Sequence, residues 1–265
     1  MRLSVVIPTW NEAQWLPRLL VCLQKWADLG EIIVADNDSS DDTIAIAKRY
    51  NCRVVPGGRP AEGRNAGSES STGDVILFVD ADAVVPQATL SHIAESFRRS
   101  PIVGLHCRLV PLGASPFVAL CYRVMDAYLR VLSRRGISQG VGTLIAVRRD
   151  AFRAVNGFRE DILVGEDADF IRRLGRIGKV HYERRAVVFT SARRFSLENQ
   201  YLFAAKTFLW TILRLFGLSS SVIPYRWKAY PAVLADTEIK ALAKVLCEES
   251  SEANIKVTQD CTHEE

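Results

Sequence analysis

The chain has 265 residues, of which 48% are hydrophobic and 24% are charged, a composition typical of a folded globular protein and not of a disordered or fibrous one. Its net charge of +4 is too small to indicate nucleic-acid binding. The six cysteines are scattered without a CxxC pair or other zinc-like spacing, which predicts reduced thiols in a cytoplasmic protein and leaves a disulfide open.

Short apolar runs alternate with helical segments in the first half of the chain. Because each run is rich in Val and Ile and lacks polar alternation, buried strands are predicted at residues 3–7, 31–35, 53–55 and 75–79. Helices are predicted between them at 12–27, 42–50 and 60–70. This repetition predicts right-handed crossovers in an open, mostly parallel α/β sheet.

The pattern changes after Pro101. Further strands are predicted at 102–105, 143–147 and 187–190, and further helices at 117–133, 150–155 and 166–175. The remainder is helical and apolar in pattern, with one more helix predicted at 237–248, and then acidic. We therefore expect an α/β domain over residues 1–195, followed by a C-terminal helical extension with an acidic tail over 196–265.

No segment has the pattern of a signal peptide or of a membrane-spanning helix. Segment 201–218 comes nearest, but Lys206 and Arg214 interrupt it. Lys206, Trp210 and Arg214 share one stripe of an otherwise mostly apolar helix, which fits a segment lying in a membrane interface. A helix buried in the core or in a dimer contact fits the same pattern. We expect a cytoplasmic protein, and peripheral contact with the cytoplasmic membrane face stays open.

Polar side chains follow three of the predicted strands. Asn11 and Glu12 come after the first strand, Asp36 ends the second, and Asp80 and Asp82 follow the fourth. Ligands of open α/β sheets bind beyond the carboxyl ends of strands, at the point where the strand order reverses. The sequence therefore predicts a ligand site at this edge of the sheet.

Some of these residues have an ordinary structural explanation as well. Ser39, Ser40 and Asp41 are suited to capping the helix that follows, although this does not explain Asp36. Asn11 and Glu12 are equally suited to a turn and to the first turn of a helix.

Asp80 and Asp82 are harder to explain without a cation. Two carboxylates that flank a small residue repel each other unless a cation or a hydrogen-bond network compensates. Mg²⁺ and Mn²⁺ take oxygen ligands and bridge carboxylates to phosphates. The pair therefore predicts a divalent cation that neutralises charge on a diphosphate leaving group. Of the four histidines, His106 and His181 are the candidates to lie near this cation.

Several motifs together resemble the family 2 glycosyltransferases, which have the GT-A fold. In the family's order, they are VVIPTWNE at 5–12, VADNDSSDDT at 34–43, GRNAG at 63–67, GDVILFVDAD at 73–82, and GF at 157–158 followed by GEDADF at 165–170. The resemblance covers roughly residues 3–195. Within the family, the chain resembles the polyprenyl-phosphate mannosyltransferases. Each motif is weak alone, but five in order are specific.

The resemblance implies transfer of a hexose, with inversion, from a nucleotide-diphosphate sugar to a lipid-linked or glycan acceptor. Within that class, mannose is the favoured sugar and GDP-mannose the favoured donor. The implied nucleotide-binding residues are Pro8, Asn11, Glu12 and Asp36, with Arg64 close to them.

The resemblance also implies the residues that carry the chemistry. Asp80 would lie near the ribose and the metal, and Asp82 would be the main ligand of Mn²⁺ or Mg²⁺. Asp167 would be the general base that deprotonates an acceptor hydroxyl, with Glu166 beside it in the substrate site. A pair of acids at a helix N-terminus explains Glu166 and Asp167 structurally.

Two departures from the family pattern stand out. Val84 occupies a position where the polyprenyl-phosphate mannosyltransferases carry Gln, so a third metal ligand must come from elsewhere in the protein or be water. The segment SARRF at 191–195 is a partial match to the Gln-x-x-Arg-Trp motif of processive synthases, which disfavours processive polymerisation. Arg193 and Arg194 fit diphosphate oxygens, and a solvated basic loop is the alternative.

Other functions fit the sequence less well. A sugar nucleotidyltransferase is disfavoured because WNEA at 10–13 is not the Gly-rich, basic loop of those enzymes. A dehydrogenase is disfavoured because no GxGxxG follows the first strand. A non-catalytic nucleotide-sugar-binding protein remains an alternative, against which the presence of Asp80, Asp82 and Asp167 argues.

Overall fold

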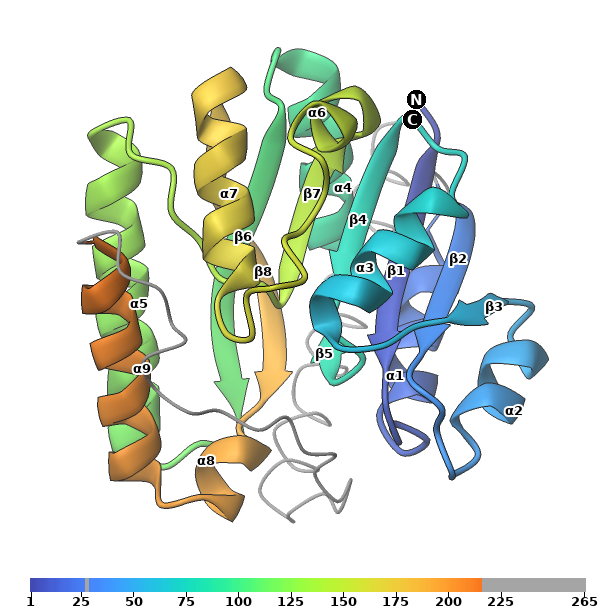
Figure 1. Cartoon of the computed structure of the whole chain (residues 1–265), viewed down its shortest axis with the longest axis horizontal. Helices are drawn as coiled ribbons and strands as arrows, with labels where there is room; N and C mark the ends of the chain where they lie inside the picture. The colour runs from blue at the N-terminus through green and yellow to red at the C-terminus, as the bar shows by residue number, and fades with distance from the viewer. Residues whose placement is uncertain (27–28, 216–265) are drawn as a thin grey trace, which may run out of the picture.

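The computed structural model describes residues 1–26 and 29–215, and the account below concerns this part of the chain. A sheet of eight described strands forms its centre, in the order β3-β2-β1-β4-β7-β6-β8-β5 (Figure 1). The strands are β1 (Leu3–Thr9), β2 (Leu29–Asp36), β3 (Arg53–Pro56), β4 (Val75–Val79), β5 (Ala83–Val84), β6 (Gly104–Leu112), β7 (Leu144–Arg148) and β8 (Val180–Ser191).

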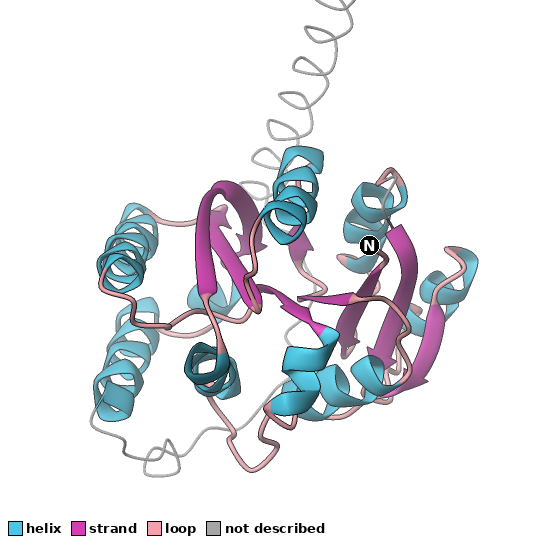
Figure 2. Ribbon diagram, turned by 90° about the horizontal axis from the view of Figure 1, so that it is seen from above, coloured by secondary structure: helices cyan, strands magenta, loops and turns pink. Residues whose placement is uncertain are grey.

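Helices cover both faces of this sheet, as Figure 2 shows. They are α1 (Leu16–Gln24), α2 (Thr43–Arg49), α3 (Pro60–Glu69), α4 (Gln87–Arg99), α5 (Pro116–Arg134), α6 (Arg149–Ala154), α7 (Glu166–Ile177), α8 (Arg193–Leu197) and α9 (Gln200–Leu215). The molecule therefore has the three layers of an α/β fold.

Two large clusters, one on each face of the sheet, form most of the core, and a third, small cluster contains Trp15, Cys22, Val84 and Leu112. Alternate residues of β1 point to opposite faces: Val5 packs with residues of α1, α2 and α4, and Val6 packs with residues of α3, α6 and α7. Phe78 of β4 contributes to the second cluster, where its ring meets that of Phe158 edge to face at 5.0 Å. Burial on both faces explains why these strands are continuous apolar runs.

Strand directions divide the sheet into two halves. Strands β3, β2, β1 and β4 are parallel neighbours, so their carboxyl ends meet at one edge. Strand β7 is antiparallel to β4, which brings the beginning of β7 to the end of β4. In the second half, β6 and β8 are parallel, and β5 pairs antiparallel with β8. The loop before β7 therefore enters the same edge as the loops after β1, β2 and β4.

Local sequence explains where the helices nearest this edge begin. Helix α5 starts at Pro116 after the N-cap Ser115, whose hydroxyl accepts the amide hydrogen of Val118 at 3.3 Å. Helix α7 starts after Gly165, which has a left-handed φ of 77°, and its first turn carries Glu166 and Asp167. Acidic residues suit this position because the helix dipole is positive there.

The predicted α/β architecture is confirmed, with differences at particular elements. Strand β4 has the predicted bounds, whereas β8 begins seven residues before the predicted 187–190 because residues 180–183 also pair with β6, ahead of a register shift at 184–186. Helix α4 was not predicted. The expected domain boundary at residue 195 falls inside α8, and the part of 201–218 beyond residue 215 and the helix expected at 237–248 lie outside the described residues.

Three further observations bear on the sequence predictions. In the described part of the chain, no helix is both long and apolar enough to cross a membrane. The cysteines at 52, 107 and 121 are free thiols. In α9, Tyr201, Leu202, Phe208 and Leu209 are exposed, so these side chains are not part of the core of this chain.

Candidate active site

The turns after β1 and β2 are joined by hydrogen bonds around Asp36. One of its carboxylate oxygens accepts the hydroxyls of Thr9 and Ser39, each at 2.7 Å, and the other accepts the Ser39 amide at 2.8 Å. The Asn11 amide donates to the Ser39 hydroxyl, and Asn11 Oδ1 accepts the Ser40 amide. Asn11 has a φ of 56°, which Asn tolerates better than most residues. The predicted residues Asn11 and Asp36 thus lie together and fix each other's loops.

Asp80 and Asp82 lie at the end of β4, next to the start of β7. The Asp80 amide donates to the carbonyl of Thr143 at 3.0 Å, which ties the two chain segments together. The side chain of Asp80 is 34% exposed, whereas that of Asp82 is only 13% exposed. The two carboxylates therefore differ, with Asp82 enclosed and Asp80 accessible to a ligand.

Arg64 of α3 connects Asp80 to the start of α7. Its guanidinium is buried and donates to Asp80 Oδ1 at 2.9 Å and to Glu166 Oε1 at 2.8 Å. Burial acts to lower the pKa of Arg64, but Asp80, Glu166 and Asp167 outweigh it and raise that pKa. Arg64 stays charged and holds acids from two distant parts of the sequence side by side.

A second arginine, Arg193 at the start of α8, lies between two carboxylates. Its Nη2 atom is 3.3 Å from Asp82 Oδ2 and also donates to Glu12 Oε1. Arg193 itself is buried, and Arg194 next to it is half-buried and close enough to lower the pKa values of Glu12 and Asp82. Predicted residues from the ends of β1, β4 and β8 thus form one charged group.

Burial shapes the protonation of this group. Burial raises the pKa of Glu12 to about 7, with Asp82 adding to the effect and Arg193 opposing it. Burial likewise raises the pKa of Asp82, although Arg193 partly offsets it. Each carboxylate is therefore a site where an added positive charge would be stabilising.

Tyr122 of α5 belongs near this group and was missed by sequence reasoning. Burial raises the pKa of its hydroxyl, and the negative charges of Asp82 and Asp80 raise it further. Its ring lies 6.1 Å from that of Phe195 in α8. A tyrosine within an amphipathic helix gives no signal of such a position, because only the packing of α5 on the sheet brings it there.

Asp167 lies in the first turn of α7, beside Glu166 and facing the loop before β7. A Cβ atom placed on Gly142 would meet Asp167 Oδ2 at 2.8 Å, so a side chain at this position would displace the carboxylate. Glu166 is buried, and burial raises its pKa, with Asp167 adding and Arg64 opposing. Arg64 thus links Asp167, through Glu166, to Asp80.

The residues present fit a hard divalent cation whose coordination is completed by substrate. Asp82 already pairs with a cation, the Arg193 guanidinium, and Asp80 stands beside it with an exposed carboxylate. Within residues 1–26 and 29–215, no three side chains of His, Cys, Asp or Glu lie close enough to hold a metal. The other ligands would then be phosphate oxygens and water, as is usual for Mg²⁺.

The contacts of three other predicted residues, Pro8, His106 and His181, are explained by the packing of the fold. Pro8 lies against α3: a Cβ atom placed on Gly63 would be 3.3 Å from the Cβ atom of Pro8. His106 is buried in β6, stacks on Tyr182 at 4.8 Å, and is not part of the acidic group. His181, in β8, is 3.4 Å from a carboxylate oxygen of Glu183.

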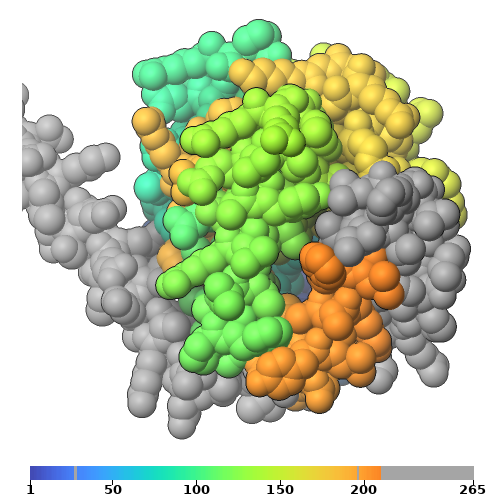
Figure 3. All heavy atoms as spheres, turned by 90° about the vertical axis from the view of Figure 1, so that its left-hand side faces the viewer, coloured from blue at the N-terminus to red at the C-terminus, as the bar shows by residue number. Residues whose placement is uncertain are grey.

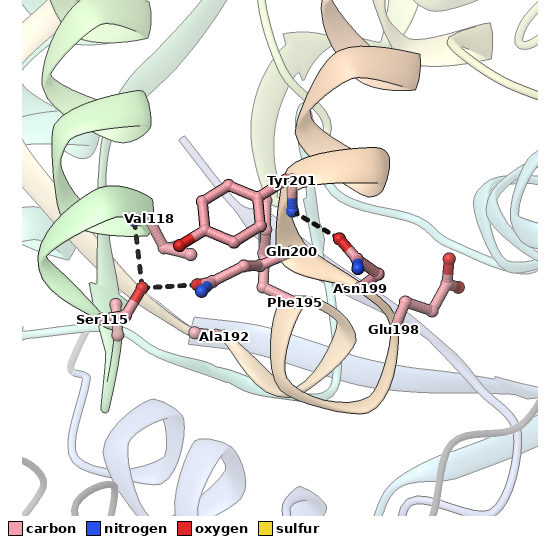
Figure 4. A pocket seen from close by; sticks show the side chains of 9 residues that line it. Ser115, Val118, Ala192, Phe195, Glu198, Asn199, Gln200 and Tyr201 are labelled. Carbon is pink, nitrogen blue, oxygen red and sulfur yellow. Dashed lines mark hydrogen bonds between the residues drawn. The ribbon is translucent and has the colours of Figure 1, made fainter.

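A pocket of about 310 Å³ lies beside α8, between the beginnings of α5 and α9 (Figure 4). Ser115 donates to Gln200 Oε1 at 2.6 Å, and Asn199 Oδ1 accepts the Tyr201 amide at 3.1 Å, so polar groups of its wall bond to each other or cap the two helices. Ala192, next to Arg193, lines it too. The pocket thus marks where α8 and α9 dock on α5, adjacent to the charged group.

Known proteins resemble this chain both in sequence and in fold. An uncharacterized glycosyltransferase of Mycobacterium tuberculosis is 31% identical over 114 residues, 39% of this chain and 51% of that protein. The poly(ribitol-phosphate) beta-N-acetylglucosaminyltransferase TarS of Staphylococcus aureus is 32% identical over 106 residues, 36% of this chain and 18% of TarS. The aligned region thus spans about half or less of these relatives.

Solved structures of glycosyltransferases also resemble this chain in fold. The structure of TarS residues 1–349 with UDP has a TM-score of 0.59 at 20% identity, over 72% of this chain and 61% of that one. The mannosyltransferase PcManGT of Pyrobaculum calidifontis, in complex with GDP-Man and Mn²⁺, has a TM-score of 0.58 at 22% identity, over 71% and 56%. The fold is therefore GT-A. Residues 4–155, more than half of the chain, match the family described as Glycosyl transferase family 2, and the chain belongs to that family.

Proposed function

We propose that the protein transfers a hexose, with inversion, from a nucleotide-diphosphate sugar to an acceptor hydroxyl, assisted by Mn²⁺ or Mg²⁺. The observation that carries this proposal is the contact of Arg64 with both Asp80 and Glu166. It puts the predicted donor and cation residues next to the predicted base, Asp167, as a single displacement requires.

The donor would bind at the ends of β1, β2 and β4. The turn held by Asn11, Glu12 and Asp36 would take the nucleoside, against the surface to which Pro8 contributes. Hydrogen bonds that fix this turn before the ligand arrives reduce the entropy lost on binding. The predicted role of Asp36 is therefore one of shaping the pocket, since its oxygens already accept hydrogen bonds from Thr9 and Ser39.

The diphosphate would change the partners of Arg193. Asp82, with Asp80, would hold the divalent cation, which when bound supplies Lewis-acid stabilisation of the departing diphosphate. Arg193 would then turn from Asp82 to the phosphate oxygens, for which its guanidinium is suited. Arg194 is close enough to join it, as its effect on the pKa of Asp82 indicates.

Asp167 would act on the acceptor. Its carboxylate would take the proton of the acceptor hydroxyl while that oxygen forms a bond to the anomeric carbon and the bond from that carbon to the diphosphate breaks. Gly142 leaves room for the carboxylate, and Glu166 with Arg64 fixes the helix turn that carries it. An acceptor phosphate, already ionised, would need Asp167 only for orientation.

For the substrates, we propose GDP-mannose as the donor and a lipid-linked or glycan acceptor. The likeness to PcManGT, with GDP-Man and Mn²⁺ in its structure, supports mannose, whereas TarS is named for N-acetylglucosamine transfer. We also propose that the C-terminal extension expected from residue 196 borders the acceptor side in its described part, residues 196–215, because α8 and α9 dock on α5 next to Arg193.

The test is release of nucleoside diphosphate from a panel of nucleotide sugars, with Mn²⁺, Mg²⁺ or EDTA, and with glycans or membrane lipid extract as acceptors. We expect metal-dependent transfer by the wild type and a loss of about 10²-fold or more in Asp82→Asn and Asp167→Asn. Asp167→Asn should still bind the donor. Asp42→Asn, an exposed change at the start of α2, is the matched control.

Other results would change the assignment. Donor binding without transfer under any condition would favour a non-catalytic binding protein. Formation of a nucleotide sugar from a sugar phosphate and a nucleoside triphosphate would favour a nucleotidyltransferase.

A further inference from the structure

Helix α5 has two sides with different surroundings. Its inner side carries Tyr122, close to Asp82, and Asp126, which accepts a hydrogen bond from Tyr182 at 2.5 Å. Its outer side carries Leu120 and Val124, which are 56% and 60% exposed. Figure 3 shows α5 (green) running across the face of the molecule that is turned to the viewer, with α9 (orange) beside it.

The exposed apolar side chains of α5 form a continuous stripe. The exposed Leu120, Val124 and Val131 follow the half-buried Phe117 at helical spacing, so all four lie on one side of the helix. The ring of Phe117 packs against that of Tyr201 at 4.7 Å. The stripe of α5 therefore meets α9 where α9 begins.

Helix α9 continues the apolar surface. Tyr201 and Phe208 are seven positions apart, so they share one side of α9, and they are 61% and 68% exposed. Leu202 and Leu209 form a second exposed pair with the same spacing. We call the exposed side chains at 120, 124, 131, 201, 202, 208 and 209 the α5–α9 face.

Basic residues accompany this face. Arg123, Arg134 and Arg135 are exposed on or directly after α5. Asp126 is the only acid in the described sequence of α5 and α9, and it faces inward, toward Tyr182 and Arg184. The face thus combines exposed apolar side chains with positive charge that no acid of the same helices balances.

From this combination we infer that the α5–α9 face binds the surface of a bilayer that contains anionic lipid. Apolar side chains flanked by arginines are typical of an interfacial helix. The apolar side chains enter the boundary of the acyl chains, and the arginines bind the anionic head groups. A symmetric contact with a second copy is disfavoured because both copies would present the same patch, so no outward-facing acid would be added to balance the arginines. The inference goes beyond the transfer reaction, and its test needs no nucleotide sugar.

The placement has a consequence for the reaction proposed above. Tyr122 and the stripe lie on opposite sides of one helix, which is about 10 Å across. A bilayer bound to the stripe would therefore lie roughly one helix diameter from the group around Asp82. That distance suits an acceptor whose polar end projects from a membrane.

The test is co-sedimentation of the full chain with vesicles of phosphatidylcholine alone and of phosphatidylcholine with phosphatidylglycerol. We expect binding to the second kind and much weaker binding to the first. Leu120→Ser with Val124→Ser should weaken binding at least about tenfold, since two exposed apolar side chains no longer enter the lipid. Arg134→Gln with Arg135→Gln should weaken it about fivefold for each arginine and flatten its dependence on salt.

Matched controls lie on other helices. Val21→Ser on α1 is also an exposed apolar change, and Arg49→Gln on α2 is an exposed basic one; neither should alter binding. Thermal unfolding of each variant shows that it folds. The inference is wrong if wild type binds neither vesicle, if binding is equal with and without phosphatidylglycerol, or if the variants of the face bind as well as wild type. A dimer in solution that Leu120→Ser with Val124→Ser dissociates would instead identify a second copy as the occupant.

Discussion

Arg193 Nη2 lies 3.3 Å from Asp82 Oδ2. The guanidinium of Arg193 thus forms an ion pair with the carboxylate that we propose as a metal ligand. The same arginine also pairs with Glu12. Because both carboxylates are largely buried, their charge is compensated before any ligand binds, and a divalent cation must compete with Arg193 for Asp82.

Arg193→Ala should therefore separate cation binding from diphosphate binding. Mn²⁺ alone should bind at least about tenfold more tightly, because the competing charge is gone. A nucleoside diphosphate with saturating Mn²⁺ should bind more weakly, because it loses a guanidinium. Electron paramagnetic resonance of free Mn²⁺ and calorimetry measure the two, with the exposed Arg99→Ala as control. Unchanged Mn²⁺ affinity would contradict the competition.

Arg64→Ala should destabilise the fold strongly. The change leaves Glu166 buried without its partner and Asp80 without its ion pair, a loss of about 3–5 kcal/mol in the free energy of unfolding. Arg59→Ala, which breaks an exposed pair with Glu62 one turn earlier, should cost less than about 1 kcal/mol. Urea unfolding monitored by circular dichroism gives both values. Equal losses in the two variants would show that Arg64 does not connect the halves of the site.

Gly142→Ala tests the placement of Asp167 without changing its chemistry. The new Cβ would meet Asp167 Oδ2 at 2.8 Å and push the carboxylate aside. If Asp167 is the base, the transfer rate should fall about 10²-fold, as expected for a displacement of about 1 Å. The KM for the donor should change little. A steady-state assay of Gly142→Ala beside Asp167→Asn measures this, and a full-rate Gly142→Ala enzyme would argue against Asp167 as the base.

His106 should make the fold sensitive to acid. Burial, and next the nearby His181, lower the pKa of His106 from 6.5 to about 3, so the folded state resists its protonation. The stability of the fold with neutral His106 is therefore fully present above pH 6.5 and is lost progressively as the pH falls toward about 3. His106→Phe can keep the stacking on Tyr182 and cannot be protonated.

The variant should therefore lose less stability than wild type between neutral pH and pH 4.5, by at least about 1 kcal/mol, roughly one pKa unit. Thermal unfolding at several pH values provides the comparison, with His92→Gln as the control. Parallel pH profiles for wild type and His106→Phe would refute the prediction.

The parts of the site that follow strands could be predicted, because strand ends are legible in a sequence. An apolar run that stops at Val79 places Asp80 and Asp82 at the edge of the sheet in advance. The partners of these acids could not be predicted in the same way. That Arg193 contacts Glu12 depends on where β8 ends relative to β1, and no local pattern encodes this.

Strand direction explains other gaps. The apolar run at 143–147 predicts a strand but not that β7 is antiparallel to β4, so the approach of Gly142 to Asp167 could not be foreseen. Tyr122 was missed for a similar reason, because its surroundings come from the docking of α5. The extra length of β8 reflects polar residues such as Glu183 and Arg184, which pattern reading assigns to loops.

The pair formed by Glu12 and Arg193 joins residues 181 positions apart. During synthesis, the first strand of the sheet and its turn leave the ribosome long before the arginine that neutralises them. A nascent chain that ends before residue 193 would hold Glu12 and Asp82 without this compensating charge. The compensation of charge around Glu12 and Asp82 is thus completed only after residue 193 has been synthesised, so the later part of the chain decides when this end of the sheet takes its final form.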